Sequence, residues 1–431
     1  MRILLLSLYY PPLNSIAALR VKAFENYLTK EGHHVDVITR YYDKEQQQGQ
    51  SMFIASESPK KFKVPYLKTD NVLYTNFDAL NSKKKFSGKL PPLIRGLYNY
   101  LHVDIFHYGW VKYVFEAFEK EYRKNTYDYV IASYGPPIAM YIAKKIFDVY
   151  RIPYLIDFRD SFIDERDVSY QLLMKKMVQR RTLKNAAGLL FATEGMKDIF
   201  LKNADEQLRK TPSCIVQNGV DDTNDSSAHA DDAATVARFE ELKAGHSFLL
   251  LHTGTLYSGQ NSDFFMEGVK EFNKKFNASG IVVFLGLAEN RSANELDYPF
   301  VYKLPRVKHT TSMYLQKRAS ALLFPIWDGR YTGFSGKILE YLFSENFIIT
   351  SPHPQSDLKE FLNISSNVFI PENNHSFTTI LEQLVSNSLV KYPLKDRDKL
   401  YRSYWVRKLI TFLTSLNRMS NANVFERTTR D

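Results

Sequence analysis

The 431-residue chain lacks several features that would assign it to particular classes of protein. It has a single cysteine, Cys214, so no disulfide bond can form within the chain. This fits a reducing compartment, and we expect a cytoplasmic protein. No apolar run reaches the roughly 18 residues of a transmembrane helix. The apolar start, RILLL, ends in Tyr-Tyr-Pro-Pro without a small-residue cleavage site, which favours a buried strand over a signal peptide.

Sequence signatures of common ligands are also missing. The turn after the first apolar run, YYPPLNSIAA, contains no glycine, whereas the dinucleotide fingerprint of Rossmann domains depends on glycines. No group of His, Cys and Asp residues has the spacing of metal ligands, so we expect no metal. The formal net charge of +10 favours acidic partners such as nucleotide phosphates or anionic lipid. The basic residues are spread along the chain without a recognition motif, so nucleic acid is not expected.

What the sequence does contain is an alternation of short apolar runs and helical patterns. The run RILLLSLYY, the helical segment that ends before Gly32 and the run HVDVITR predict a βαβ unit and therefore a parallel sheet. The alternation continues to residue 222 and resumes at residue 246. We predict an α/β protein with two Rossmann-like domains facing a central cleft. The expected parts are a first domain at 1–222, a linker with a short helix at 223–245, a second domain at 246–395 and a C-terminal helix at 396–431 that packs toward the first domain.

Ligands of open α/β sheets bind outside the carboxyl ends of the strands, so the turns there are the candidate sites. The stretch RYTGFSGKILEYL, residues 330–342, is a near miss for a P-loop, because Tyr331 and Ile338 occupy two of the motif's fixed positions. Gly336 and the start of the following helix still favour an anion site, to which Lys337 adds charge. The alternative is an ordinary turn followed by a solvated lysine.

Other turns carry charged residues or glycine. In IDFRDSF, Asp157, Arg159 and Asp160 follow a buried strand, where they must be paired or solvated in a cleft. A carboxylate there could orient an acceptor hydroxyl or take part in proton transfer, and the alternative is an Asp–Arg pair that fixes the loop. Gly135 marks a rigid loop that suits either shape or substrate contact. Gly254 opens a phosphate-sized niche at a helix start.

Two segments are rich in basic residues. The segment 83–115 mixes basic and aromatic residues, which suits a membrane surface, but burial of its aromatics in the first domain is the interpretation that we favour. The run KKMVQRR, residues 175–181, is interpreted as a solvated face.

Taken in order, these segments resemble the GT-B retaining glycosyltransferases of family 4 (group 1), in the branch with an Asp-Phe-Arg-Asp motif. The resemblance rests on the opening strand, Pro-Pro loop and Arg-bearing helix, on IDFRDSF, on IVQNGVDD, on LLHTGTLYSGQN and on FSGKILEYLFSENFIITSP. It covers most of the chain. It implies a nucleotide-diphosphate sugar held mainly by the second domain, an acceptor on the first domain, transfer with retention and no required metal.

The resemblance also implies roles for individual residues. Glu340 would bind the nucleotide ribose, and Lys337 would face the diphosphate or the sugar. The expected donor-binding residues are Gly254, Thr255, Arg306, Val307, Arg330, Ser335, Gly336, Lys337 and Glu340. The expected catalytic residues are Asp157, Arg159, Asp160 and Lys337, and the expected acceptor-side residues are Asn14, Arg20, Tyr134 and Gly135.

The chain departs from the family pattern at three places. Thr332 stands where a first glutamate is frequent, Leu256 and Gln260 stand near the usual basic pair of the donor loop, and Asn14-Ser15 replaces a frequent Gly-Gly. We expect a glycosyltransferase that builds a cell-surface polysaccharide on a glycan or lipid-linked acceptor, at the inner face of the membrane. The alternatives are a nucleotide-sugar epimerase or hydrolase of this fold and a non-catalytic nucleotide-sugar-binding relative.

Overall fold

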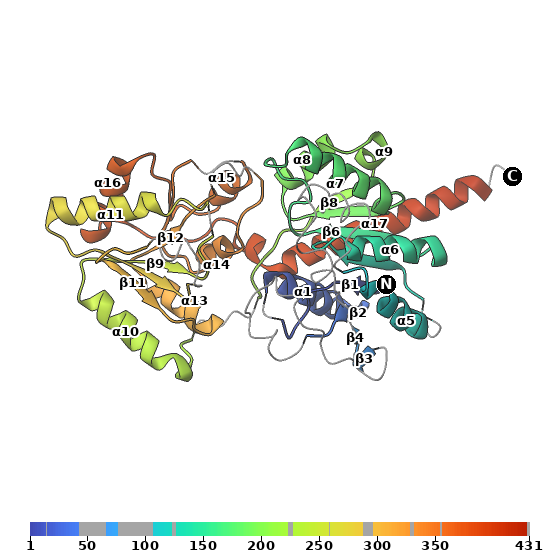
Figure 1. Ribbon diagram of the computed structural model, residues 1–431, viewed down its shortest axis with the longest axis horizontal. Helices are drawn as coiled ribbons and strands as arrows, with labels where there is room; N and C mark the ends of the chain where they lie inside the picture. The colour runs from blue at the N-terminus through green and yellow to red at the C-terminus, as the bar shows by residue number, and fades with distance from the viewer. Residues whose placement is uncertain are drawn as a thin grey trace, which may run out of the picture. The chain divides into compact units, whose positions relative to one another are not determined.

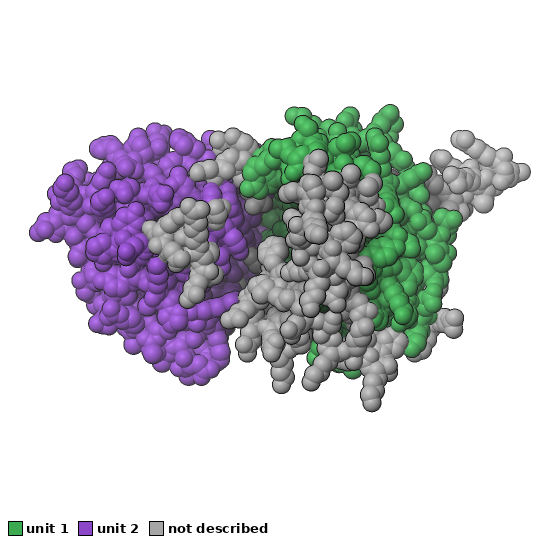
Figure 2. Space-filling view, in the orientation of Figure 1, with its two compact units in different colours: residues 1–218, 402–431 green, residues 219–401 purple. Residues whose placement is uncertain are grey.

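The computed structural model describes residues 1–13, 15–42, 66–75, 107–122, 126–222, 227–257, 259–287, 296–327, 332–353 and 356–428. The chain divides into two compact units. Unit 1 comprises Met1–Asn218 and Arg402–Asp431, and unit 2 comprises Gly219–Tyr401 (Figure 2). Each unit is built on one sheet with helices on both faces (Figure 1).

Unit 1 contains an eight-stranded sheet in the order β3-β4-β2-β1-β5-β6-β7-β8. β3 pairs antiparallel with β4, and the other pairs are parallel. The strands are β1 (Arg2–Leu6), β2 (His34–Arg40), β3 (Tyr66–Thr69), β4 (Val72–Thr75), β5 (Tyr129–Ser133), β6 (Tyr154–Phe158), β7 (Gly188–Phe191) and β8 (Ser213–Ile215). The strand order reverses between β1 and β5, and the carboxyl ends of these strands are where such a sheet takes a ligand.

The sheet of unit 1 buries side chains on both faces. In β1, Leu4 and Leu6 pack into one core while Ile3 and Leu5 pack into the other, as the two-residue period of a strand requires. The helices are α1 (Ile16–Lys30), α5 (Trp110–Tyr122), α6 (Ile138–Tyr150), α7 (Ser169–Thr182), α8 (Glu194–Lys202), α9 (Glu206–Arg209) and α17 (Arg402–Thr428). α17 packs against α1 and β8, so the end of the chain completes the core of unit 1.

Unit 2 contains a six-stranded parallel sheet in the order β11-β10-β9-β12-β13-β14. Its strands are β9 (Leu249–Thr253), β10 (Ile281–Leu285), β11 (Val301–Leu304), β12 (Ala321–Phe324), β13 (Ile348–Thr350) and β14 (Val368–Phe369). Its helices are η1 (Ala230–Asp232), α10 (Ala233–Ala244), α11 (Asp263–Phe276), α13 (His309–Arg318), α14 (Lys337–Phe343), α15 (Ser356–Leu362), α16 (Asn374–Val385) and η2 (Arg397–Leu400). Here the strand order reverses between β9 and β12, which places the turns that follow them at the ligand-binding edge.

The prediction of two parallel α/β domains is confirmed. Within the described ranges, no helix has both the length and the apolar character needed to cross a bilayer. Of the basic and aromatic segment 83–115, residues 83–106 lie outside the described residues, while Trp110 and Val114 on α5 are fully buried in unit 1.

Candidate functional site

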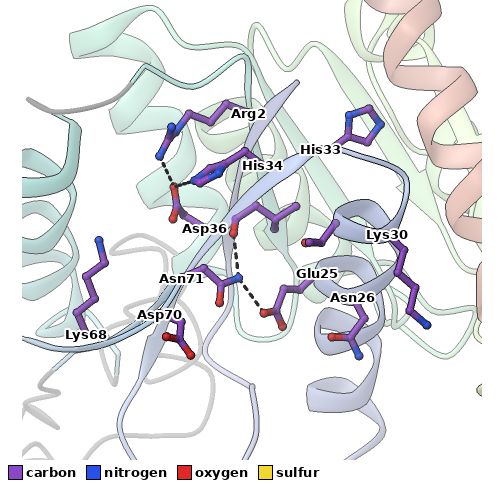
Figure 3. Close-up of a pocket in the computed structure, with 12 residues that line it drawn as sticks. Arg2, Glu25, Asn26, Lys30, His33, His34, Asp36, Lys68, Asp70 and Asn71 are labelled. Carbon is purple, nitrogen blue, oxygen red and sulfur yellow. Dashed lines mark hydrogen bonds and ion pairs between the residues drawn. The ribbon is translucent and has the colours of Figure 1, made fainter.

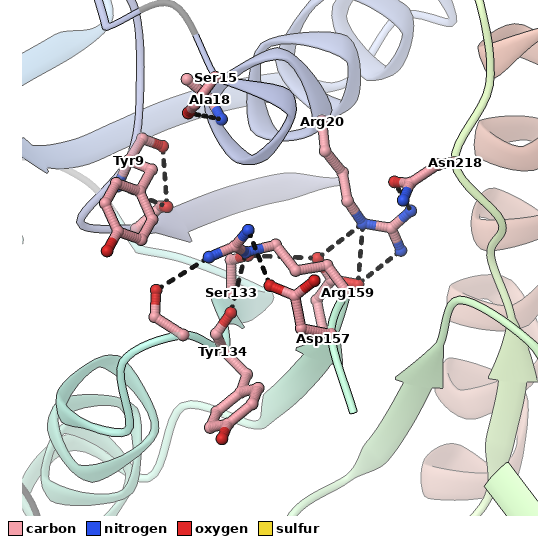
Figure 4. Close-up of polar contacts among 12 residues, drawn as sticks. Tyr9, Ser15, Ala18, Arg20, Ser133, Tyr134, Asp157, Arg159 and Asn218 are labelled. Carbon is pink, nitrogen blue, oxygen red and sulfur yellow. Dashed lines mark hydrogen bonds and ion pairs between the residues drawn. The ribbon is translucent and has the colours of Figure 1, made fainter. Parts of the chain in front are cut away.

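A buried ion pair lies at the carboxyl edge of the sheet in unit 1 (Figure 4). Asp157, near the end of β6, and Arg20, on α1, have side chains that are 0% and 4% exposed. The Arg20 guanidinium donates from Nη2 to Asp157 Oδ1 at 2.6 Å and from Nε to Oδ2 at 3.0 Å. It also donates to the carbonyl of Val216 at 2.6 Å and to Asn218 Oδ1 at 3.0 Å. This arginine therefore joins α1, β6 and the segment after β8. Its Nε, Nη1 and Nη2 atoms each donate to an acceptor of the protein.

Arg159 connects the turns at the same edge of unit 1. It donates from Nε to the carbonyl of Tyr134 at 2.9 Å and from Nη2 to the carbonyl of Gly135 at 3.0 Å, and it lies over the ring of Tyr9 (Figure 4). Gly135 has φ +100°, and a Cβ there would lie 2.7 Å from Arg159 Nη2, so the turn requires glycine. Asp160 pairs with Arg159 at 3.1 Å and keeps its side chain 64% exposed.

The structure thus brings together six of the predicted residues of the first domain: Arg20, Tyr134, Gly135, Asp157, Arg159 and Asp160. It does not pair Asp157 with its sequence neighbour Arg159, because Arg20 takes the buried carboxylate. Asp160, by contrast, presents its carboxylate to solvent. Asn14 lies outside the described residues, and Ser15 beside it caps α1 by accepting from the Ala18 amide.

In unit 2, Lys337 reaches from the start of α14 to the turn after β9. Its ammonium donates to the carbonyl of Thr255 and lies 3.1 Å from His252 Nε2. Gly254 has φ +79°, and a Cβ there would lie 3.3 Å from Lys337 Cε. The lysine stem therefore lies against the glycine backbone, and its ammonium is held at the carboxyl end of the central strand rather than solvated.

The tautomer of His252 follows from its two contacts. Its Nδ1 lies 3.1 Å from the carbonyl of Leu323, so Nδ1 carries the proton and Nε2 accepts from Lys337. Burial, and the neighbouring charge of Lys337, lower the pKa of His252 to about 3, which keeps the imidazole neutral. Burial also lowers the pKa of Lys337 to about 8, against a smaller opposing effect of Glu340.

The predicted ribose ligand lies on the same helix as Lys337. Glu340 Oε1 is 3.1 Å from His309 Nε2, at the start of α13. Arg306 and Val307 follow β11, and the backbone of Arg306 lies 3.3 Å from the position of a Cβ on Gly286, in the turn after β10. The turns after β9, β10 and β11 and the start of α14 therefore share one edge of unit 2.

The remaining predicted donor residues flank Lys337. Ser335 Oγ accepts from the Lys337 amide at 3.4 Å, and Gly336 precedes the first residue of α14. The side chain of Thr332, at the place of the expected first glutamate, is buried. Arg330 lies outside the described residues.

Sequence reasoning missed two histidines of this edge, His252 and His309. His252 was detectable in principle, because it is a polar residue at the end of the apolar run FLLLHT, where burial must be compensated by hydrogen bonds. His309 had no comparable signal, since it is the first residue of an ordinary polar helix and contacts Glu340 only because the fold brings the two together.

A pocket of about 760 Å³ lies at the opposite edge of unit 1, where β1 and β2 begin (Figure 3). Several of its charged side chains are paired within the protein. Asp36 accepts from Arg2 at 3.1 Å and lies 3.3 Å from His34, and Glu25 accepts from Asn71 at 2.8 Å. Because the amino ends of the strands face this pocket, whereas ligands of such sheets bind at the carboxyl ends, we do not place the functional site there. Among the described residues, no three His, Cys, Asp or Glu side chains are grouped so that they could hold a metal ion.

Comparison of the coordinates with solved structures supports the architecture. The structure is similar to HepE from Anabaena in complex with UDP-glucose, with 11% identity, a TM-score of 0.57 and coverage of 99% of this chain and 100% of that one. The fold is GT-B. An alpha,alpha-trehalose 6-phosphate synthase from Burkholderia multivorans matches with 11% identity and a TM-score of 0.63 over 98% of both chains. Sucrose-phosphate synthase from Thermosynechococcus elongatus matches with 11% identity and a TM-score of 0.54 over the full length of both chains. No family model and no curated protein sequence matches the chain.

Proposed function

We propose that the protein is a retaining glycosyltransferase of the family-4 type. It moves a sugar, of the hexosyl type, from a nucleotide-diphosphate sugar to a glycan or lipid-linked acceptor in cell-surface polysaccharide biosynthesis. The observation that carries the proposal is the Lys337 ammonium, held beside Gly254 with uncharged hydrogen-bond partners at the switch point of unit 2. The GT-B fold supports it, since GT-B neighbours include HepE crystallised with UDP and with UDP-glucose.

The charge of Lys337 suits a diphosphate. A partly buried ammonium whose hydrogen-bond partners are uncharged is disfavoured by desolvation, which the smaller opposing effect of Glu340 does not cancel, and an anionic ligand would offset that cost. When the bond between the sugar and the diphosphate breaks, negative charge develops on the leaving phosphate, and a fixed ammonium stabilises that charge. The backbone amides of Ser335 and Gly336, which directly precede α14, would add further donors for a phosphate. We therefore assign Lys337 to the diphosphate.

The other donor contacts follow from the shared edge of unit 2. Glu340, held by His309, would accept from the ribose hydroxyls, and Arg306 and Val307 would contact the base. Arg330, which lies outside the described residues, is assigned to the donor from the sequence resemblance alone.

On the acceptor side, the contacts within unit 1 distinguish the charged residues. Asp157 and Arg20 are buried against each other, so we propose that they position the acceptor-side turns. Arg159 holds the Tyr134–Gly135 turn, and the exposed Asp160 carboxylate is the group that could orient or deprotonate an acceptor hydroxyl. Asn14 is assigned to the acceptor from the sequence alone. No metal is required in this proposal, and the enzyme would work in the cytoplasm at the inner face of the membrane.

A second function is favoured by one specific feature. Thr332 replaces an expected carboxylate and is buried, which fits a relative that binds the nucleotide sugar without transferring it, or that epimerises or hydrolyses it.

Product analysis distinguishes these functions. A thermal-shift panel of nucleotide-diphosphate sugars identifies the donor, which is then labelled in its sugar and incubated with and without a bacterial lipid extract.

The proposed transferase yields a labelled lipid or glycan that mass spectrometry detects, and only when the extract is present. An altered or free sugar without the extract would indicate the epimerase or hydrolase instead. Donor-induced stabilisation without consumption across a broad panel of acceptors would indicate a binding protein. Glu340→Ala should reduce the donor-induced shift, while Glu360→Ala, on the exposed side of α15, serves as the matched control.

A further inference from the structure

α7 carries an exposed apolar stripe on the surface of unit 1. The side chains of Tyr170, Leu173 and Met177 are 47%, 56% and 37% exposed. Their spacing of three and four residues places them on one side of the helix. Met174 and Val178, on the other side, are buried. The stripe is therefore available to a partner outside unit 1.

Basic residues border this stripe. The segment 169–185 contains five Lys and Arg residues and no Asp or Glu. At helical spacing, Arg180 continues the line of Leu173 and Met177, while Lys176 and Arg181 lie on its two sides. The run KKMVQRR is thus not evenly solvated. Its Val178 and Gln179 are buried, and its exposed residues combine methionine with positive charge.

The acidic residues that precede α7 already have partners. Asp167 accepts from Lys175 Nζ at 2.6 Å, and Asp164 accepts from Arg166 Nε at 2.6 Å. Lys175 thereby has its partner on the inner side of the helix. The charged residues on the exposed face of α7 itself are all basic.

The neighbouring helix α6, which packs against α7, extends the surface with aromatic and basic side chains. Arg181 lies over the ring of Tyr141 at 5.7 Å, and Lys145 lies over the same ring at 5.2 Å. Tyr108, which is 40% exposed, has its ring 6.0 Å from that of Tyr141. Aromatic rings with one apolar and one polar end, next to Lys and Arg, are typical of protein surfaces that lie at a membrane interface.

We propose that this surface, the α7 face, docks on a lipid bilayer that contains anionic lipid. We define it by Tyr170, Leu173, Lys176, Met177, Arg180 and Arg181. The apolar side chains would enter the boundary between headgroups and acyl chains, while the long basic side chains reach the anionic headgroups. Charge complementarity selects an anionic surface, and the narrow apolar stripe matches the shallow insertion of an interfacial helix. The inference rests on this surface alone and does not depend on the proposed transfer reaction.

Vesicle sedimentation of the full chain tests the docking. The protein should sediment with vesicles of phosphatidylcholine mixed with phosphatidylglycerol, but not with phosphatidylcholine alone, and added salt should weaken the binding. Leu173→Ser should weaken it about tenfold, because it removes the most exposed apolar side chain of the helix. Arg180→Gln should weaken it about fivefold, the effect of one basic residue at an anionic surface.

A matched control exists at the end of α11 in unit 2. Phe276 is 42% exposed and lies beside the ammonium of Lys275, but Glu267 and Glu271 are on the same helix. Phe276→Ser and Lys274→Gln should leave vesicle binding unchanged. Thermal unfolding of each variant shows whether it folds, and Tyr170→Ser provides a second α7 variant if Leu173→Ser is unstable.

Two results would overturn the proposal. The first is a wild-type chain that does not sediment with the anionic vesicles at low salt. The second is vesicle binding that the α7 variants leave unchanged, which would place the contact on another surface. Sedimentation velocity is run in parallel, because self-association that the α7 variants abolish, without vesicle binding, would identify the face as an interface between copies and would contradict docking on lipid.

Discussion

The two units treat buried charge at their ligand-binding edges in opposite ways. In unit 1, Asp157 is neutralised by Arg20, and the arginine has further acceptors on Val216 and Asn218. In unit 2, the hydrogen-bond partners of the Lys337 ammonium are a carbonyl and a neutral imidazole. An ion pair contributes to a fixed geometry, whereas a desolvated cation whose hydrogen-bond partners are uncharged favours binding of an anion. From this comparison we infer that the ion pair in unit 1 supports the turns around it, whereas the Lys337 edge of unit 2 binds the diphosphate.

The largest effect is expected from breaking the pair in unit 1. Asp157→Ala leaves Arg20 buried without its carboxylate, which should lower the free energy of unfolding by about 3–5 kcal/mol. The double variant Arg20→Met with Asp157→Leu should recover much of this loss, because two apolar side chains leave no buried charge. Urea denaturation measures both. A single variant that unfolds like the wild type would show that the pair does not support unit 1.

Lys337→Met should give the opposite pattern. It removes a partly buried ammonium whose charged form is disfavoured by desolvation more than Glu340 favours it, so the free energy of unfolding should not fall. Loss of a charge-assisted contact of about 1.5–3 kcal/mol should weaken nucleotide-diphosphate binding by about tenfold to a hundredfold. Calorimetric titration with the donor that the thermal-shift panel identifies measures this change, with Lys359→Met on α15 as the control. If Lys337→Met and the control bind the donor with equal affinity, the diphosphate does not bind at this edge.

The two turn glycines allow a finer comparison. Gly135→Ala places a methyl group 2.7 Å from Arg159 Nη2, and Gly254→Ala places one 3.3 Å from Lys337 Cε, both at positive φ. Each should cost about 1–3 kcal/mol of stability, with the greater cost at Gly135, where the clash is closer. Gly254→Ala should also weaken donor binding, because it displaces the lysine stem. Gly245→Ala, at negative φ, is the control, and both effects are read from thermal unfolding and titration.

A smaller effect is expected from pH. The pKa of Lys337 is about 8 in the folded protein, below its usual 10.5, so the free protein loses the ammonium as pH rises through 8. Diphosphate affinity should then fall by up to about tenfold for each further pH unit, and Lys337→Met should lack this dependence. Stability should change in the other direction between pH 8 and 10.5. There the unfolded chain still binds the proton that the folded chain has released, so the contribution of Lys337 to stability rises with pH.

The sequence was sufficient to predict the alternation of strands and helices, because runs such as RILLL and FLLLHT are buried on both faces of a sheet. It also located the turns at the strand ends, and the structure brings together Gly254, Thr255 and Lys337, which the family resemblance assigned to one site. It could not pair Arg20 with Asp157, which lies 137 residues further along the chain. For the same reason the roles of Asp157 and Asp160 could not be separated, since one is buried by distant residues and the other is exposed.

The exposed face of α7 is another feature that the sequence alone could not predict. KKMVQRR has the composition of a solvated run, and only the packing of the helix shows which of its residues point outward. His252 is a further case, because its neutral state depends on the carbonyl of Leu323 and on Lys337, which come from other elements.

The central claim is that the Lys337 edge of unit 2 binds the diphosphate of a nucleotide sugar. A crystal structure of the full chain, grown with the nucleoside diphosphate that gives the largest thermal shift, tests it most directly. The account predicts a phosphate oxygen within hydrogen-bond distance of Lys337 Nζ and the ribose beside Glu340. A nucleotide bound elsewhere, with Lys337 still held by His252 and Thr255, would contradict it.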